Sequence, residues 1–210
     1  MSSLRDIQTL PWIHKYNTKI FCETGTGLGS GLMRMLQVEY GFNGLFSCEI
    51  DQDLAKHSQK TFSFDTRIMI FHSTGVDMLK NILPRIKLEI PIMYWLDSHF
   101  QNSDYNLGDK PLVPHSDGDV DIRLPIWKEV SLIKELRIDK GAKDFILIDD
   151  AMLYDPIDRY EDKVERLGRG AVPAEQRNLL PKIIDLFKNT HKSQIITLSQ
   201  GFLALHPLKI

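Results

Sequence analysis

The sequence predicts an α/β fold: a doubly wound, mostly parallel seven-stranded sheet with a C-terminal antiparallel hairpin. Three observations lead to this. Short apolar runs alternate with amphipathic stretches along almost the whole chain, which is the pattern of repeated strand–helix units. Most runs are apolar at nearly every position, as expected for strands covered on both faces. The last two runs are separated by little more than Gln200 and Gly201, which favours a hairpin.

Seven apolar runs are the predicted strands. Each is short and is bounded by glycine, proline or polar residues, which end a strand more readily than they continue one. In chain order the runs are KIFCETG (19–25), GLFSCEID (44–51), RIMIFHS (67–73), IPIMYWLDS (90–98), DFILIDDA (144–151), SQIITLSQ (193–200) and GFLALHP (201–207).

Amphipathic stretches between these runs are the predicted helices. The first is closed by Gly41, a residue type that commonly ends helices. The fourth has Pro125 near its start, where the missing N–H of proline removes no helical hydrogen bond. The predicted helices cover residues 29–41, 52–62, 76–83, 124–138 and 175–189.

A length of 210 residues suits one domain with a sizeable core, 1–210, of which residues 1–17 form an N-terminal extension. Side chains of this extension, including Trp12 and Tyr16, are expected to pack either on this chain or on a partner, so a homo-oligomer is one open alternative. Two polar segments without periodicity, 100–123 and 152–174, each follow a predicted strand. Because ligands bind beyond the carboxyl ends of strands in open α/β sheets, we expect both segments to be lids.

Composition narrows the class of protein. Apolar residues make up 42% of the chain and charged residues 26%, which is ordinary for a soluble globular protein. A net charge of −2 predicts no overall attraction to nucleic acid or to an anionic membrane. Cys22 and Cys48 lie in apolar runs and are expected to be buried free thiols. No segment has the pattern of a signal peptide or a membrane span, so the predicted location is cytoplasmic.

The clearest functional signal is the stretch IFCETGTGLGSGL (20–32), in which an apolar run leads through glycines into a predicted helix. Such a turn aims helix N–H groups at a ligand. The dinucleotide pattern G-x-G-x-x-G fails in both registers, because Ser30 or Leu32 stands at its third glycine. Glu23, two residues before Gly25, would repel a pyrophosphate. It suits a ligand with an ammonium and a sulfonium group, such as S-adenosylmethionine.

A second acid follows the next predicted strand. Glu49 lies roughly twenty residues beyond the glycines, where a carboxylate accepts ribose hydroxyls of either NAD or S-adenosylmethionine. Ile50 is placed to cover one face of the adenine. Ser73 and Thr74, at the end of the third strand, are placed to meet the edge of the base.

The segment ETGTGLG (23–29) is similar to the E/D-x-G-x-G-x-G motif of class I S-adenosylmethionine-dependent methyltransferases. The order of strands and the final hairpin also resemble that family, so the resemblance covers nearly the whole chain. It implies a Rossmann-like fold and S-adenosylmethionine as cofactor. A nicotinamide enzyme, a non-catalytic module, and glycines that merely pack a helix on a strand remain alternatives. The cofactor-binding residues that it implies are Glu23, Gly25, Thr26, Gly27, Gly29, Glu49, Ile50, Ser73, Thr74 and Asp97.

The end of the fourth predicted strand bears on the acceptor. Enzymes of this family that methylate amino groups of bases or glutamine tend to carry N/D-P-P-Y/F there, whereas this chain has WLDSHF (95–100). The sequence also has no basic stripe. A nucleic-acid substrate is therefore not expected, and a small-molecule acceptor is.

Three carboxylates end the fourth and fifth predicted strands: Asp97, Asp149 and Asp150. If they converge, they raise one another's pKa unless a divalent cation such as Mg²⁺ binds between them. The pattern resembles cation-dependent O-methyltransferases. Asp150 replaces the Asn of the catechol and caffeoyl-CoA types, which implies the macrocin type and methylation of a sugar hydroxyl. Alternatively, these aspartates only orient the acceptor, or they bond to loop N–H groups.

A sugar hydroxyl is a poor nucleophile at neutral pH, so a metal and a proton acceptor would both assist its methylation. His99, two residues after Asp97, is the predicted base, and the two together are the predicted catalytic residues. Asp104, Lys110 and His115 are rival candidates for the base. An ordinary loop histidine is the alternative for His99.

Overall fold

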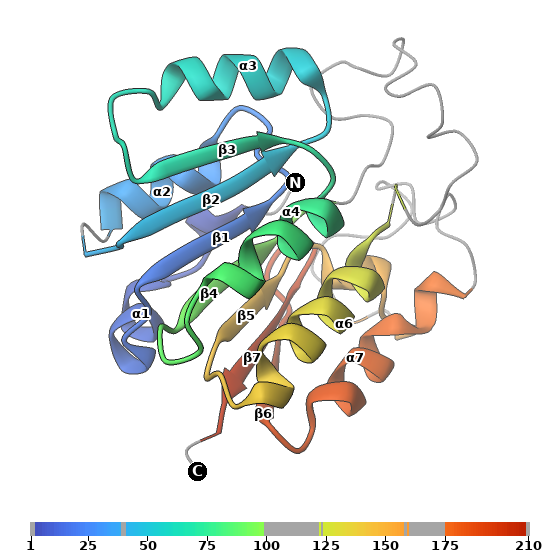
Figure 1. Cartoon of the computed structure of the whole chain (residues 1–210). Coiled ribbons are helices and arrows are strands. Elements are labelled where there is room, and N and C mark those ends of the chain that lie inside the picture. The colour runs from blue at the N-terminus through green and yellow to red at the C-terminus, as the bar shows by residue number, and fades with distance from the viewer. Residues whose placement is uncertain are drawn as a thin grey trace, which may run out of the picture.

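The computed structural model describes residues 3–38, 41–98, 122, 124–157, 159 and 175–208. It contains a seven-stranded sheet in the order β3-β2-β1-β4-β5-β7-β6 (Figure 1). All neighbouring pairs are parallel except those made by β7, which is antiparallel to both β5 and β6. The predicted doubly wound sheet with a closing hairpin is therefore confirmed. Its strands are β1 (Ile20–Thr24), β2 (Gly44–Glu49), β3 (Ile68–His72), β4 (Ile92–Leu96), β5 (Phe145–Ile148), β6 (His191–Ile196) and β7 (Phe202–Pro207).

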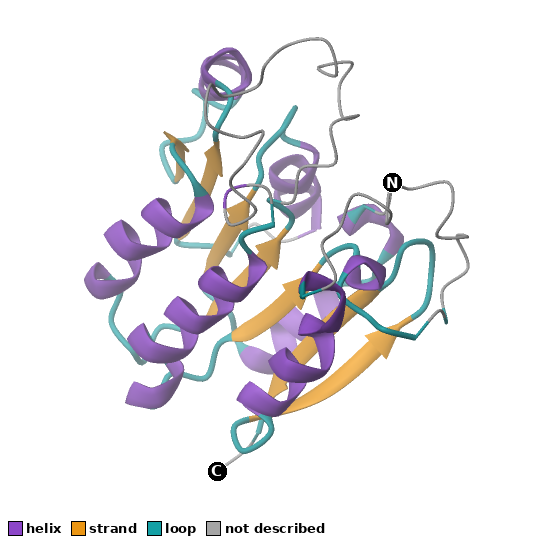
Figure 2. Cartoon of the chain, turned by 90° about the vertical axis from the view of Figure 1, so that its right-hand side faces the viewer, coloured by secondary structure: helices purple, strands orange, loops and turns teal. Residues whose placement is uncertain are grey.

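Helices cover both faces of the sheet (Figures 1 and 2). The α-helices are α1 (Leu10–Tyr16), α2 (Ser30–Val38), α3 (Gln52–Thr61), α4 (Gly75–Ile82), α6 (Ile126–Leu136) and α7 (Leu179–Phe187). Short 3₁₀ helices are η1 (Leu4–Asp6), η2 (Leu83–Arg85), η4 (Ile138–Lys140), η5 (Ala151–Leu153) and η8 (Gln176–Asn178). Among the described residues, no helix is long and apolar enough to cross a membrane.

Two core clusters lie on opposite faces because successive strand residues point in opposite directions. Phe21 and Trp95 belong to the cluster that includes residues of α1 and α2. Cys22 and Tyr94 belong to the cluster formed with α4, α6 and α7. Cys22 and Cys48 are both buried free thiols, as the sequence predicts.

Several elements are shorter than predicted. The apolar runs 90–98 and 144–151 form strands only to Leu96 and Ile148, which are the last paired residues of the β4–β5 ladder. The polar residues beyond them leave the ladder and begin the loops of the site. The predicted helix 175–189 starts as a 3₁₀ turn and becomes α-helical only at Leu179.

The N-terminal extension packs on this chain. Ile13 of α1 is buried in the core. The Tyr16 ring stacks on Phe145 of β5 with ring centroids 5.5 Å apart, and the Trp12 ring is tilted against Phe145 at 5.2 Å. The hydroxyl of Tyr16 lies 2.9 Å from Nδ1 of His206 on β7. Of the two expected locations for these aromatic side chains, the structure shows the intramolecular one.

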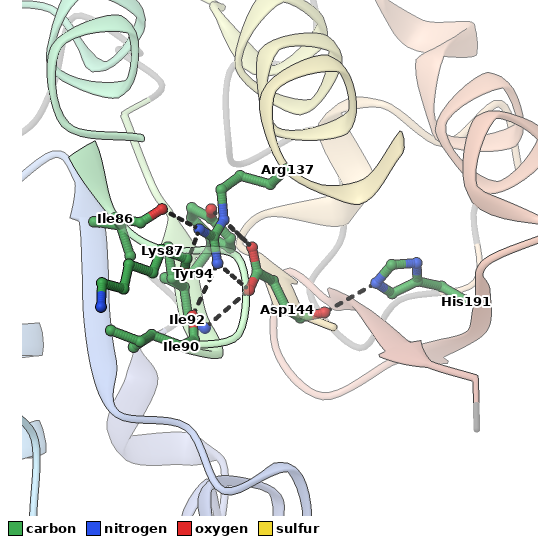
Figure 3. Close-up of polar contacts among 8 residues, drawn as sticks. All are labelled: Ile86, Lys87, Ile90, Ile92, Tyr94, Arg137, Asp144 and His191. Atoms are coloured by element: carbon green, nitrogen blue, oxygen red, sulfur yellow. Dashed lines mark hydrogen bonds and ion pairs between the residues drawn. The ribbon is translucent and has the colours of Figure 1, made fainter. Parts of the chain in front are cut away.

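A buried ion pair between Arg137 and Asp144 holds the amino end of the sheet (Figure 3). Nε of Arg137 lies 2.9 Å from Oδ2 of Asp144, and both side chains are fully buried. Asp144 also accepts the N–H of Ile92 and the hydroxyl of Tyr94 on β4. A buried ion pair is tolerated when further hydrogen bonds satisfy its atoms, as they do here. The guanidinium also donates to the backbone carbonyls of Ile86, Lys87 and Ile90.

Candidate functional site

The glycine turn after β1 has a backbone that only glycine adopts readily. Gly25, Gly27 and Gly29 have φ of +85°, +50° and +82°, in the left-handed region. A Cβ on Gly25 would collide with the backbone carbonyl of Asp97. The turn therefore passes directly against the segment that leaves β4, and the backbone conformation favours glycine at all three alternate positions.

This turn lies at the point where the connections of the sheet change sides. β1 pairs with β2 on one side and β4 on the other, and Thr24 is in register with Cys48 and Leu96. The N–H of Asp97 donates to the carbonyl of Thr24 at 3.1 Å. Ligands bind at such a switch point in open α/β sheets. The structure thus brings the predicted glycine, β2-end and β4-end residues to one edge.

Glu49 is bonded to the glycine turn. Its Oε2 accepts the N–H of Gly27 at 2.8 Å, and its Oε1 accepts the N–H of Asp51 at 3.0 Å. The side chain is 8% exposed, and burial raises the pKa of its carboxyl group. This contact brings a carboxyl group to the turn, where its charge would oppose a pyrophosphate, and leaves acceptor capacity toward a ribose.

Glu23 lies below the turn, between β1 and α2. Its side chain is 1% exposed, and a Cβ on Gly31 would collide with its Oε1. Ser47 donates to Oε2 of Glu23 at 2.6 Å, and the hydroxyls of Ser47 and Thr26 are also 2.6 Å apart. Burial raises the pKa of Glu23 to about 8, and the charge of Glu49 acts in the same direction. A nearby cation would favour the ionised form.

The end of β3 offers one uncommitted hydroxyl. Oγ of Ser73 is buried and has no hydrogen-bond partner among the described residues. Such a group costs free energy until a ligand or a water satisfies it. The side chain of Thr74 instead caps α4, because its Oγ1 accepts the N–H of Asp77 at 3.1 Å. Ser73, rather than Thr74, therefore has a side chain available for the edge of a base.

The three predicted metal ligands directly follow β4 and β5. Asp150 has φ +44°, and its side chain is 3% exposed. With the amide of Gln200 oriented to donate, its nitrogen lies 2.5 and 2.7 Å from the two carboxylate oxygens of Asp150. Oδ1 of Asp149 accepts the N–H of Asp150 at 2.8 Å. Among the described residues, no three His, Cys, Asp or Glu side chains are placed to hold a metal. The predicted metal site at Asp97, Asp149 and Asp150 is not confirmed.

The predicted base lies outside the described residues. This holds for His99 and for its rivals Asp104, Lys110 and His115. It also holds for most of the predicted lids, of which the structure describes only residues 122, 152–157 and 159.

Sequence reasoning missed one acid of this edge, Glu129 in the first turn of α6. It is 1% exposed and accepts the hydroxyls of Ser98 at 2.7 Å and Thr24 at 3.4 Å. A signal for it exists in the sequence. Glu129 stands between Ile126 and Val130 in the buried stripe of the helix, where an apolar residue is expected.

The sequence matches no protein-family model and no curated protein. Solved structures, however, are similar over the whole chain. The O-methyltransferase TomG from Streptomyces achromogenes, solved in complex with SAM (S-adenosylmethionine), has a TM-score of 0.62 at 11% identity, covering 100% of this chain and 82% of TomG. The chain has the fold of the class I methyltransferases.

Two further structures agree with this fold. The methyltransferase PaMTH1 from Podospora anserina, bound to SAH (S-adenosylhomocysteine), has a TM-score of 0.60 at 13% identity, with 100% of this chain and 80% of that chain covered. An O-methyltransferase from Bacillus cereus in complex with SAH has a TM-score of 0.59 at 13% identity, with coverages of 99% and 83%. The similarity to methyltransferase structures therefore covers almost the whole chain, whereas the glycine motif covers only residues 23–29.

Proposed function

We propose that this chain is an S-adenosylmethionine-dependent O-methyltransferase that acts on a hydroxyl of a sugar or a sugar-bearing small molecule. The observation that carries the proposal is the pair of buried carboxyl groups at the glycine turn. Glu49 accepts the N–H of Gly27 in the turn, and Glu23 lies just below. Within a methyltransferase fold, an acidic glycine turn suits a cationic amino-acid nucleoside and opposes a dinucleotide.

The residues present fit this cofactor. Glu49 has acceptor capacity for the ribose hydroxyls, and Ser73 has a buried hydroxyl without a partner for the edge of the base. The glycine turn allows close approach of the backbone because no Cβ stands there. When bound, the cofactor supplies a methyl group on a positively charged sulfur. Glu23 supplies negative charge near the ammonium group once it ionises.

The proposed acceptor is small and is not a nucleic acid. Support comes from the β4 exit, which reads WLDSHF rather than N/D-P-P-Y/F, and from the net charge of −2. The sugar class rests on Asp149–Asp150, the acidic pair by which the sequence resembles sugar O-methyltransferases. In this in-line displacement the hydroxyl oxygen takes the methyl group from sulfur and its proton passes to a base, for which His99 is the proposed residue. The aspartates assist mainly by orienting the hydroxyl and by excluding water.

The proposal contains no metal step. With the amide of Gln200 oriented to donate, its nitrogen is within hydrogen-bond distance of the carboxylate of Asp150, the residue that distinguishes the implied cation site. We assign to Asp97 and Asp149, at adjacent strand ends, the orientation of the acceptor hydroxyl. Their neighbouring position follows from the β4–β5 register, in which Leu96 is paired with Ile148.

The test is calorimetric titration of the wild type and of Glu49→Ala with S-adenosylmethionine and S-adenosylhomocysteine. We expect micromolar binding to the wild type and at least about a tenfold loss in the variant, since a ribose acceptor is removed. Asp185→Asn, which removes an exposed carboxylate at the far end of α7, is the control and should bind like the wild type. Binding of NADH instead of both ligands would support the nicotinamide alternative and contradict the proposal.

A further inference from the structure

A buried carboxylate also lies on the other face of β1. Glu23 and Thr24 are consecutive, so their side chains point to opposite faces of the sheet. Glu23 packs against Gly31 of α2, whereas Thr24 donates to Glu129 of α6. The end of β1 therefore has one buried acid on each face of the sheet, Glu23 of β1 itself on the side of α2 and Glu129 of α6 on the other. Only the first of these acids is part of the glycine motif.

Glu129 connects the segments that surround the proposed cofactor. Its Oε1 accepts the hydroxyl of Ser98, in the β4 exit, and its Oε2 accepts that of Thr24, at the end of β1. A Cβ on Gly75, at the start of α4, would collide with the same Oε1. The carboxylate thus lies beneath the junction of three strand-end segments, at the switch point of the sheet.

The charge of Glu129 acts across this edge. Burial, and after it the charge of Glu129, raises the pKa of Cys22 on β1, of Cys48 on β2 and of Tyr154 after β5. A charge in the interior interacts more strongly than the same charge in water because the effective dielectric constant is lower. A ligand at the switch point lies at the same edge as this carboxylate, which accepts the hydroxyls of Thr24 and Ser98 there.

We propose that Glu129 is a specificity-determining residue that favours the cationic methyl donor over its product. This rests on the proposed function. S-adenosylmethionine and S-adenosylhomocysteine share the ribose, the adenine and the amino-acid group, and they differ in the methyl group and in one positive charge at sulfur. In its ionised form, the carboxylate of Glu129 at this same edge acts on that charge difference. It stabilises the bound donor and, once the methyl has left, no longer stabilises the neutral sulfur, which favours product release.

A purely structural role makes a different prediction. If Glu129 only fixes Ser98 and Thr24, its loss weakens the donor and the product by the same factor, because both ligands use the same segments. If its charge is used, the donor alone weakens further. The ratio of the two dissociation constants therefore separates the two roles.

The experiment measures both dissociation constants by calorimetry for the wild type, Glu129→Gln, Ser98→Ala and Asp185→Asn. We expect Glu129→Gln to lower the preference for S-adenosylmethionine over S-adenosylhomocysteine roughly fivefold. Ser98→Ala removes a hydrogen bond to the same carboxylate without removing its charge, and it should leave the preference unchanged. Asp185→Asn changes the net charge by the same amount at an exposed site on α7 and should also leave it unchanged.

Circular dichroism establishes first that each variant is folded. If Glu129→Gln does not fold, Glu129→Asp takes its place. Withdrawing the charge by one methylene should lower the preference roughly twofold, since the interaction falls with distance. An unchanged preference in whichever variant is measured would overturn the inference while the proposed function stands. A wild type that binds neither ligand would overturn both.

Discussion

The two ends of the parallel sheet differ in whether their buried carboxyl groups are paired with a cationic side chain. At the amino end, Asp144 is paired with Arg137, and both side chains make several hydrogen bonds (Figure 3). At the carboxyl end, Glu23 and Glu49 are bonded by hydroxyl and amide groups, and neither forms an ion pair among the described residues. The first arrangement satisfies its charges within the chain. The second buries carboxyl groups whose pKa is raised, and a cationic ligand would stabilise their ionised form, so one end stabilises the fold and the other is suited to binding.

The largest effect should follow from breaking the amino end. Asp144→Ala leaves the guanidinium of Arg137 buried without its carboxylate, and loss of one partner of a buried pair typically destabilises a protein by about 3–5 kcal/mol. Urea denaturation measures the free energy of unfolding. Asp139→Ala, which removes the partner of Lys134 in a more exposed ion pair, is the control and should change it by less than about 0.5 kcal/mol. A loss below about 1 kcal/mol for Asp144→Ala would show that the amino end is not held by this pair.

A pH-dependent effect is expected at the carboxyl end. Burial raises the pKa of Glu23 from 4.5 to about 8, so the folded chain keeps a proton that the unfolded chain has released. The stability contributed by this group is full below pH 4.5 and is lost as the pH rises toward 8. The free energy of unfolding of the wild type, relative to Glu23→Gln, should therefore fall by about 1 kcal/mol per pH unit across this range.

Urea titrations of both proteins at several pH values measure this slope, and taking their difference removes the contributions of other groups. Saturation with S-adenosylmethionine should flatten the slope, because a bound cation stabilises the ionised carboxylate and lowers its pKa. A difference that is constant with pH would contradict the description of Glu23 as a carboxyl group that is protonated in the ligand-free fold.

The smallest expected effect is that of a chelator. Because Asp150 is bonded to Gln200, we expect EDTA to change the rate of methyl transfer by less than about twofold. Rates are measured with and without EDTA and again after addition of Mg²⁺. A rate that EDTA abolishes and Mg²⁺ restores would show that the aspartates bind a metal. The carboxyl end would then balance its buried acids with a cation taken from solution, whereas the amino end uses Arg137 of the chain itself.

The parts of the fold that depend on local pattern could be predicted. Alternating apolar runs and amphipathic stretches predicted the sheet, the covering helices and the hairpin. A strand that is buried on both faces is apolar at nearly every position, so the sequence shows it directly. The glycine turn was also predictable, since positive φ values restrict Gly25, Gly27 and Gly29 by local geometry alone. Glu49 was placed from its position at a strand end, and the structure brings it to Gly27.

Contacts between distant segments were decided only by the tertiary structure. Glu129 lies 105 residues from Thr24 along the chain, and nothing local to α6 shows which strand its carboxylate meets. The same is true of Gln200, whose amide nitrogen reaches the carboxylate of Asp150 when it is oriented to donate. Local periodicity specifies which face of a helix or strand is buried, whereas the partner of a buried polar group depends on how the layers pack. The sequence by itself therefore determined the fold and the glycine turn, and packing decided which carboxylates share the site.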